Sequence, residues 1–357
     1  MADRHTAEKW LAELTNTPTA SGLEDVVVEW VTSWAGRRDD LRVESDSGGN
    51  LFVTQKGRKA KTSVFAVAHM DHPAFVITDV DGSFEFRGSV DAVYFDNARV
   101  DVVSRLDGPT GRVESYDAET HSGTAHFVGQ VEPGDIGMWR FRNTRQKRGF
   151  FRAPACDDLA GVAAALAALD RARRRDDLRH FGVMLTRAEE VGLIGAIHAA
   201  KQRTIPEGAR LLSIETSREL ADARIGAGPI IRVGDRSTIF DREMSNRISH
   251  AAEAAGISHQ RKLMDGGGCE ATAFGVYGYQ ATGLCLALGN WHNRGNLSAV
   301  ESGDGSAAVP MLEEISIDDF HGLVDLLLVA AEAVDADDGI VDRLDRLYES
   351  NRHYLAR

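Results

Sequence analysis

The chain has 357 residues, of which 43% are hydrophobic and 27% are charged, a composition typical of folded globular proteins. Its formal net charge of −13 argues against a nucleic-acid partner, because a surface that follows phosphates needs clustered Lys and Arg. The length exceeds that of one typical domain and predicts a large domain that carries a smaller one.

The sequence predicts a cytoplasmic protein without a membrane partner. Its three cysteines are too few and too scattered for a disulfide framework, which favours a reducing compartment. The first residues lack the basic start and apolar run of a signal peptide. The longest apolar stretch, residues 323–334, is interrupted by Asp325 and Glu332, so it does not have the character of a membrane span.

The first 70 residues predict two helices followed by short strands. Residues 7–34 show the periodicity of two amphipathic helices, separated by turn residues at 17–22. Short strands are expected at residues 42–45, 51–55 and 63–68. The last of these is a continuous apolar run, as expected of a strand that is buried on both faces.

Residues 75–151 have a different pattern. Short alternating segments rich in Val, Phe, Gly and Asp recur between turn residues every eight to twelve positions, the spacing of a small barrel or sandwich. From residue 157 onward, helical and strand patterns alternate, with helices expected at 159–169, 192–200, 244–255, 317–335 and 340–354 and strands at 181–186, 211–216 and 282–288. We therefore predict an α/β domain with an inserted small all-β domain.

Five short segments carry carboxylate or imidazole groups where strands should end: His69-Met70-Asp71, Asp157-Asp158, Glu189-Glu190, Glu215 and His292. Each has an ordinary explanation, such as a surface loop, a helix cap or an acidic first turn. Together they lie at the carboxyl ends of strands of one sheet, where α/β folds build their sites. Two imidazoles and several carboxylates suit two metal ions that share a carboxylate and activate water.

Local chemistry suggests individual roles for some of these groups. Asp71 and His69 point the same way on an extended chain, so the carboxylate can accept the imidazole N–H and orient the other ring nitrogen toward a metal. Asp157 has two free carboxylate oxygens, as a bridging ligand requires. Glu189 and Glu190 point in different directions, so one can bind metal while the other takes a proton from water.

Glu215 and His292 complete the set. A charge at the end of the buried strand that contains Glu215 is costly unless it is paired or binds a metal. His292 follows another apolar strand, in a loop rich in Gly and Asn. A lone histidine in a loop is more often exposed to solvent, so the assignment of His292 depends on the other segments.

The sequence resembles peptidase family M42, the dinuclear metallo-aminopeptidases related to M28 and M20 within clan MH. The resemblance runs through nearly the whole chain and is carried by residues 14–24, 49–53, 132–135 and 156–161. Its most specific part is Glu189-Glu190-Val191-Gly192, followed by Gly195-Ala196. The resemblance implies a three-layer αβα mixed-sheet metallopeptidase domain formed by residues 1–74 and 152–357. It also implies that residues 75–151 form an inserted small all-β barrel that serves as a dimerisation or lid domain.

The resemblance also assigns roles to residues. His69 and Glu215 would bind one metal ion, Glu190 and His292 the other, and Asp157 would bridge them. Asp71 would orient His69, Glu189 would be the general base, and the Asp157–Asp158 peptide bond is expected to be cis. The two divalent ions are expected to be zinc, with cobalt or manganese as alternatives.

The implied activity is hydrolysis of the N-terminal residues of short peptides. Two alternatives remain open at this point: a dinuclear-metal deacylase or amidohydrolase that acts on non-peptide amides, and a catalytically silent scaffold. The resemblance further implies a homo-oligomer, from a dimer up to a dodecamer, with the inserted β domain as the interface.

Several positions depart from the family pattern. His72 stands where the family usually has Glu, Glu215 where it usually has Asp, and Asn293 where Ser is usual. Residues 268–272 replace a Thr-Asp-Ala segment. Because Glu is an equally competent oxygen donor, we expect these changes to affect substrate preference more than metal binding.

Overall fold

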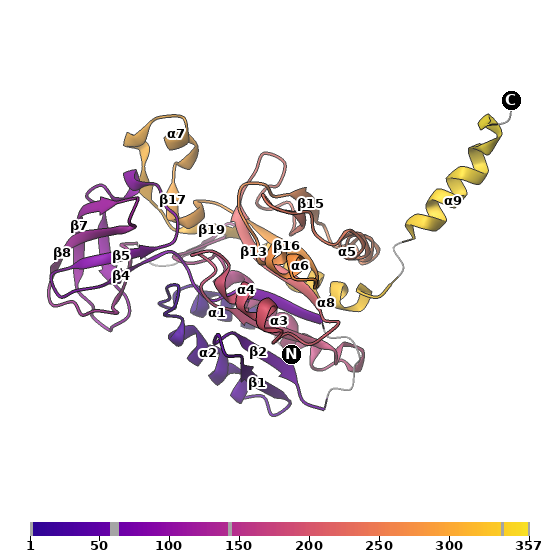
Figure 1. Cartoon of the computed structure of the whole chain (residues 1–357), viewed down its shortest axis with the longest axis horizontal. Coiled ribbons are helices and arrows are strands. Elements are labelled where there is room, and N and C mark those ends of the chain that lie inside the picture. The colour runs from indigo at the N-terminus through magenta and orange to yellow at the C-terminus, as the bar shows by residue number, and fades with distance from the viewer. Residues whose placement is uncertain (1–2, 58–63, 142–144, 337–338, 356–357) are drawn as a thin grey trace.

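An eight-stranded mixed sheet forms the centre of the larger part of the molecule (Figure 1). The computed structural model describes residues 3–57, 64–141, 145–336 and 339–355. The sheet runs in the order β1 (Leu41–Ser45), β2 (Leu51–Gln55), β12 (Phe181–Thr186), β3 (Val64–His69), β13 (Arg210–Arg218), β16 (Gln280–Leu288), β14 (Ile230–Gly234) and β15 (Gln260–Leu263). Strands β12, β3, β13 and β16 are parallel to their neighbours in this central group, so their carboxyl ends meet at one edge of the sheet.

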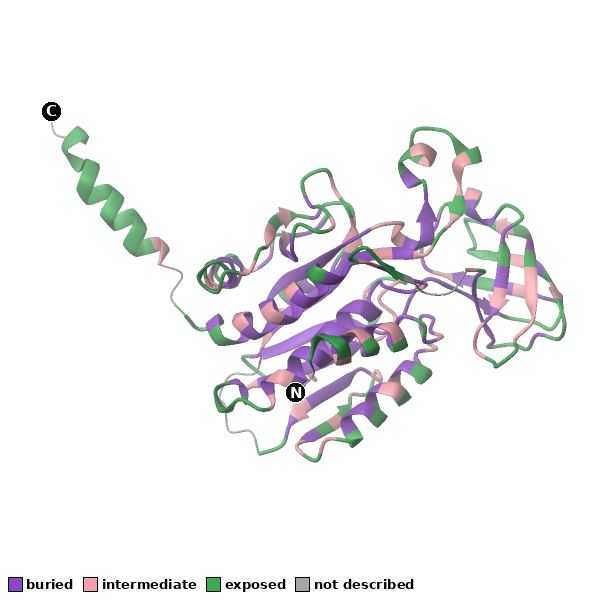
Figure 2. Ribbon diagram, turned by 180° about the vertical axis from the view of Figure 1, so that it is seen from behind, coloured by how far each residue is buried: buried purple, intermediate pink, exposed green. Residues whose placement is uncertain are grey.

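Helices cover both faces of this sheet. One face carries α1 (Arg4–Leu14), α3 (Leu159–Ala172), α5 (Arg242–Ala254) and α8 (Ile317–Ala333), and the other carries α4 (Ile194–Gln202) and α6 (Glu270–Val276). Side chains of the buried strand β3 alternate between the two layers: Ala66 packs in the first, Phe65 and Val67 in the second. The predicted three-layer αβα fold is confirmed, and Figure 2 shows the buried strands between the helices.

The residues nearest the N-terminus and the third helix also follow the predicted pattern. Helix α2 (Asp25–Gly36) packs Val27, Val31 and Trp34 into the core that it shares with α1 and α3. In α3 almost every residue is buried, and half of its residues are alanines. These small side chains let the helix lie close to both the sheet and α8, since they take little space and lose no side-chain entropy on burial.

A closed six-stranded antiparallel barrel lies beside the sheet. Its strands follow the order β4 (Ala74–Ile77), β5 (Ser83–Arg87), β8 (Ser122–Val128), β7 (Thr110–Asp117), β6 (Arg99–Val102) and β9 (Ile136–Trp139). Aromatic rings fill it: Phe75 has edge contacts with Phe84, Phe86, Phe95 and Trp139, with ring centroids 4.7–5.7 Å apart. The prediction of a small inserted all-β barrel is confirmed.

The chain returns from the barrel through two strands that belong to another sheet. Strands β10 (Arg145–Lys147) and β11 (Phe150–Ala153) form a three-stranded sheet with β19 (Glu313–Ser316) from the C-terminal part. The barrel is thus tied to the larger sheet region from two directions, through β4 directly after β3 and through β11. The predicted domain limits at residues 75 and 151 stay a prediction.

The last helix lies outside both parts. Helix α9 (Ile340–Asn351) continues into a 3₁₀ turn at Arg352–Leu355 and extends away from the body (Figures 1 and 2). All three cysteines are buried and free. No helix within the described ranges is long and apolar enough to cross a membrane.

Candidate metal centre

The predicted site residues gather at the carboxyl ends of the parallel strands. His69 ends β3 and lies in register with Thr186 at the end of β12, from which the chain continues to Glu189 and Glu190. Glu215 lies in β13, beside Cys285 of β16. Asp157 precedes α3, and His292 lies in the loop that follows β16. Residues far apart in sequence therefore meet in one place because their strands share one direction.

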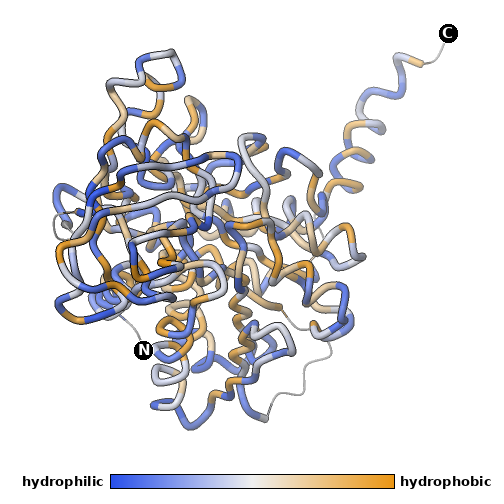
Figure 3. The backbone as a smooth tube through the Cα atoms, turned by 60° about the vertical axis from the view of Figure 1, so that its left-hand side comes forward, coloured by the Kyte–Doolittle hydropathy of each residue, from blue (hydrophilic) through white to orange (hydrophobic). Residues whose placement is uncertain are grey.

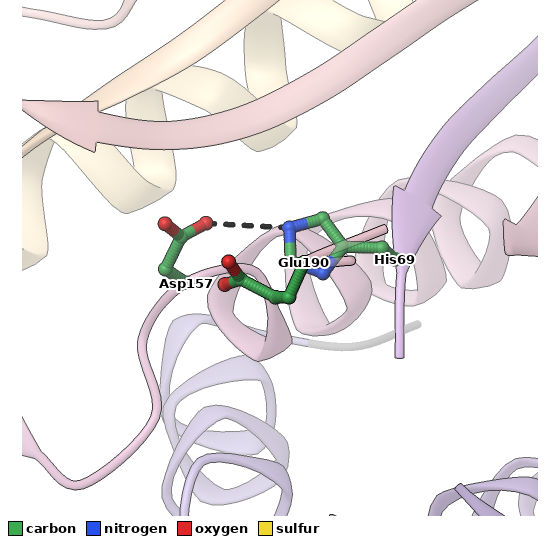
Figure 4. Close-up of side chains that lie close together, drawn as sticks. All are labelled: His69, Asp157 and Glu190. Atoms are coloured by element: carbon green, nitrogen blue, oxygen red, sulfur yellow. Dashed lines mark ion pairs between the residues drawn. The ribbon is translucent and has the colours of Figure 1, made fainter. Parts of the chain in front are cut away.

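Asp157 lies between the two imidazoles, with one oxygen facing each. Its Oδ1 is 3.4 Å from His69 Nε2, and its Oδ2 is 3.5 Å from His292 Nε2. Glu215 Oε1 is 3.5 Å from His69 Nε2 and Glu190 Oε2 is 3.2 Å from His292 Nε2, so each imidazole has a glutamate of its own. Figure 4 shows the side chains of His69, Asp157 and Glu190 directed toward a common space.

Several polar atoms that face this space have no hydrogen-bond partner among the described residues. They are His69 Nε2, Asp157 Oδ1, Glu190 Oε1 and Glu215 Oε2. Buried polar atoms of this kind are costly unless a ligand satisfies them. One ligand atom each from His69, Asp157 and Glu190 lie within 4.8 Å of one another. Imidazole nitrogen and carboxylate oxygen suit divalent ions such as zinc, cobalt or manganese, so the residues present fit such ions.

Burial and mutual proximity shift the pKa values of these groups. Burial disfavours the charged ring of His69, but the nearby carboxylates of Asp157 and Asp71 outweigh this effect and hold the pKa of His69 well above its usual value. Burial also disfavours the charged ring of His292. The carboxylates of Glu190 and Asp157 outweigh this effect and hold the pKa of His292 well above its usual value. Burial itself raises the pKa of Glu189 well above its ordinary range, and nearby carboxylates add to the rise.

Asp71 holds the backbone of the Glu189-Glu190 segment. Its Oδ1 accepts from Glu189 N at 3.0 Å, and its Oδ2 accepts from Glu190 N at 3.1 Å and from the Ser21 hydroxyl at 2.6 Å. His69 Nδ1 lies 3.1 Å from the Asp71 carbonyl oxygen and 3.4 Å from Asp71 Oδ1. Asp71 thus contacts the histidine as expected, but it also orders the two glutamates, a function for which the sequence contained no signal.

Glu313 is a site residue that the sequence analysis missed. Its Oε2 accepts from Cys156 N at 2.7 Å and from Asp157 N at 3.0 Å, and its Oε1 accepts from His292 N at 2.8 Å. It therefore joins two segments that carry predicted ligands. Burial raises its pKa to about 7. The only sequence signal was a pair of glutamates at the start of a short strand, which is too common to be informative.

The unusual residues His72 and Asn293 contact each other. His72 Nε2 lies 3.1 Å from Asn293 Oδ1, and its Nδ1 lies 2.6 Å from the Asp157 carbonyl oxygen. Asn293 Nδ2 donates to the carbonyls of Pro154 and Met311, which orients its Oδ1 toward the ring. The two residues that depart from the family pattern are therefore buried in contact with each other, and His72 also contacts the backbone of Asp157.

The Asp157–Asp158 peptide bond is cis, as the resemblance implied. An Asp directly before a helix ordinarily caps that helix with its side chain. Asp158 occupies the N-cap position, but its side chain makes no capping hydrogen bond. Its Oδ1 accepts instead from the Thr216 hydroxyl at 2.7 Å, which ties the start of α3 to β13.

A cavity of about 180 Å³ opens beside the clustered carboxylates. Asp157, Glu189, Glu190, Glu215 and His292 line one side of it. The other side is formed by Met264, a glycine loop at residues 266–268, Trp291 and the buried Arg232. Arg232 donates to the carbonyl oxygens of Met264, Gly267 and Gly268 and thereby fixes this otherwise flexible loop. The cavity can hold a small group next to these carboxylates.

Comparisons with known proteins show the family and the fold of this chain. A family model described as M42 glutamyl aminopeptidase matches residues 116–309. A curated protein of Acetivibrio thermocellus, named "Putative aminopeptidase", is 26% identical over 266 residues, which cover 65% of this chain and 74% of that protein. The aminopeptidase APDkam598 from the archaeon Desulfurococcus kamchatkensis has a similar structure, with a TM-score of 0.73 and 22% identity over 95% of this chain and 98% of that one. The Pyrococcus horikoshii TET1 peptidase, which can assemble into a tetrahedron or a large octahedral shell, gives a TM-score of 0.72 and 22% identity over 91% and 99% of the two chains.

Proposed function

The chain belongs to the M42 family of aminopeptidases, and from this premise we propose that it removes N-terminal residues from short peptides with two divalent metal ions. The observation that carries the proposal is Asp157, whose two carboxylate oxygens each face a different imidazole. This is the arrangement that a carboxylate bridging two ions requires. The buried polar atoms without partners around it support the same assignment.

The proposed ligands divide into two groups around Asp157. His69 and Glu215 would hold one ion, and His292 and Glu190 the other. When bound, such ions supply a water molecule that loses its proton near neutral pH and stabilise the negative charge that develops on a carbonyl oxygen. We propose zinc, with cobalt or manganese as alternatives.

Glu189 is the proposed general base. Its Oε2 lies 4.0 Å from His69 Nε2, at the edge of the cluster and within the cavity lining. A carboxyl group whose pKa is raised by burial can take the proton of the attacking water and then return it to the leaving amine. The hydrogen bond from Glu189 N to Asp71 keeps the backbone of this base in place.

The proposed oligomer follows from family membership and from the similar TET1 peptidase, which can assemble into a tetrahedron or a large octahedral shell. We propose that the chain forms a homo-oligomer, from a dimer up to a dodecamer, with the inserted barrel as an interface. A monomeric mass in solution would contradict this part of the proposal. The cytoplasmic location stays a prediction from the sequence.

The replacement Glu189→Gln tests the catalytic assignment. Metal content, measured by elemental analysis, should stay at the wild-type level, while hydrolysis of aminoacyl substrates should fall by roughly a hundredfold to ten-thousandfold. Glu253→Gln, an exposed glutamate on α5, is the matched control and should leave both quantities unchanged. Full activity of Glu189→Gln would exclude this residue as the base.

A substrate panel separates the proposed activity from its alternatives. The metal-loaded wild-type chain should hydrolyse aminoacyl amides with a free amino group. Hydrolysis of N-acyl amides alone would indicate a deacylase. Failure to hydrolyse either class at full metal content would indicate a scaffold.

A further inference from the structure

Helix α9 presents a large apolar surface to solvent. Every residue from 341 to 355 is exposed, and the helix extends away from the body (Figures 1 and 2). The exposed apolar side chains are Val341 (67%), Leu344 (56%), Leu347 (58%), Tyr348 (55%), Tyr354 (79%) and Leu355 (74%). A helix of 12 residues without tertiary packing is only marginally stable in water. α9 therefore requires a surface against which its apolar side chains can pack.

The apolar side chains of α9 form one stripe. Val341, Leu344 and Tyr348 follow the alternating three- and four-residue spacing of a helix that packs along another helix, with Asn351 at the next position and Leu355 continuing the spacing into the 3₁₀ turn. Leu347 and Tyr354 widen the stripe along one side. Figure 3 shows hydrophobic and hydrophilic residues alternating along this helix. The pattern indicates a helix as the partner surface.

The charges of α9 argue against a lipid surface. Residues 340–355 contain three acidic side chains, at 342, 345 and 349, and three arginines, at 343, 346 and 352. Interfacial helices bind anionic lipids through an excess of Lys and Arg on the polar face. With equal numbers of acids and arginines, α9 gains no such attraction.

We propose that the α9 helices of two copies of this chain pair side by side in opposite directions. Asp345 and Arg352 lie seven residues apart on the same edge of the stripe, opposite the edge formed by Leu347 and Tyr354. In an antiparallel pair, Asp345 of one copy lies beside Arg352 of the other, and the twofold symmetry makes this contact twice. The same alignment sets Tyr348 of one copy opposite Asn351 of the other, so both polar groups face a partner.

A parallel pair would not use these charges. There, the edge of one helix that carries Leu347 would face the edge of the other that carries Arg352, and neither Asp345 nor Arg352 would meet an opposite charge. Arg352 Nε, at the start of the 3₁₀ turn, is 2.9 Å from Oε2 of Glu349 in α9 of the same chain. That exposed pair contributes little stability, and the remaining guanidinium nitrogens stay free to contact Asp345 of the second copy.

Charge reversal tests this pairing in the full-length chain. Asp345→Arg and Arg352→Asp each place like charges side by side at both symmetric contacts. Sedimentation over a concentration series should show self-association through α9 weakened about tenfold or more. Leu344→Asp, which puts a charge into the stripe, should remove this association entirely. Asp342→Arg and Arg346→Asp make the same charge changes on the opposite face of α9 and should have no effect.

Restoration distinguishes a second copy from any other partner. The double variant Asp345→Arg/Arg352→Asp exchanges the two charges and should recover wild-type association. An equimolar mixture of the two single variants should recover it as well, because each mixed pair then carries opposite charges at both contacts. If neither restores association, or if Leu344→Asp leaves the sedimentation unchanged, the pairing is wrong. The test does not depend on hydrolysis, so it stands or fails separately from the proposed function.

Discussion

Carboxylates outside the proposed ligand set hold the ligands in place. Asp71 accepts the N–H groups of Glu189 and Glu190, and Glu313 accepts those of Asp157 and His292. Each of these supporting carboxylates is buried, and its oxygen atoms accept hydrogen bonds from the backbone N–H groups around it. The positions of the proposed ligands therefore depend on residues outside the proposed ligand set, as is usual for metal sites.

Glu313→Gln should disturb the site without removing a ligand. The amide NH₂ that replaces one oxygen would face at least one of the backbone N–H groups that Glu313 now accepts, whichever way the amide is turned. The loss should be about 1–3 kcal/mol of unfolding free energy, measured by chemical denaturation, together with weaker metal binding in a competition assay. Glu314→Gln removes only a half-buried ion pair with Arg152 and should cost less than about 1 kcal/mol. Equal effects of the two variants would contradict the supporting role of Glu313.

At the scale of elements, the direction of strands assembles the site and aromatic packing assembles the barrel. β3 and β12 run parallel and in register, so His69 lies beside the end of the strand that leads to Glu189. The barrel has strands of only four to eight residues, and its interior is filled by the rings around Phe75. The two parts therefore have separate hydrophobic cores.

Phe75→Ala should destabilise the barrel by about 3–5 kcal/mol, because it opens a cavity among four other rings. Phe127→Ala, a half-buried residue at the edge of the same core, should cost clearly less. Guanidinium unfolding measures both, with barrel unfolding followed by the fluorescence of Trp139 in a background whose other four tryptophans are replaced by phenylalanine and α/β unfolding followed by circular dichroism. If residues 75–151 form a domain of their own, the first variant should move the fluorescence transition to lower denaturant than the circular-dichroism transition. Coincident transitions would count against the predicted domain limits.

At the scale of the whole molecule, the proposed ligands tie together distant parts of the chain. They come from residue 69 to residue 292 and from strands on both sides of the sheet centre. The unfolded chain does not hold these groups near one another, so ions that bind here bind the folded state preferentially. The same carboxylates that attract the ions repel one another without them.

Removal of metal should therefore lower thermal stability. An ion present at a thousand times its dissociation constant stabilises the folded state by about 4 kcal/mol, which corresponds to roughly 5 °C in Tm for a chain of this length. Differential scanning calorimetry with and without a chelator, followed by addition of excess zinc, measures the loss and its recovery. Asp157→Asn, which removes the proposed shared ligand, should show little response to either treatment. If neither chelator nor zinc changes the Tm of the wild-type chain, the ions do not stabilise the folded state.

The sequence by itself determined the features that depend on local pattern. The apolar run before His69 predicted a buried strand, and the changes in periodicity at residues 75 and 157 predicted a barrel inserted into an α/β fold. Polar groups at strand ends predicted the residues that cluster around Asp157. These inferences succeed because burial and backbone period act on neighbouring residues, and parallel strands bring their ends together in any fold of this class.

Only the tertiary structure decided which groups support that cluster. Glu313 meets Cys156 N across 157 positions in sequence, and His72 meets Asn293 across 221. The periodicity of the sequence does not predict such pairs. A hydrogen bond between distant segments depends on how whole elements pack, and small changes in the distance between donor and acceptor decide whether it forms. The exposed stripe of α9 lies between these cases. Its helical pattern is local and was predicted, but only the structure shows that its apolar side chains are exposed.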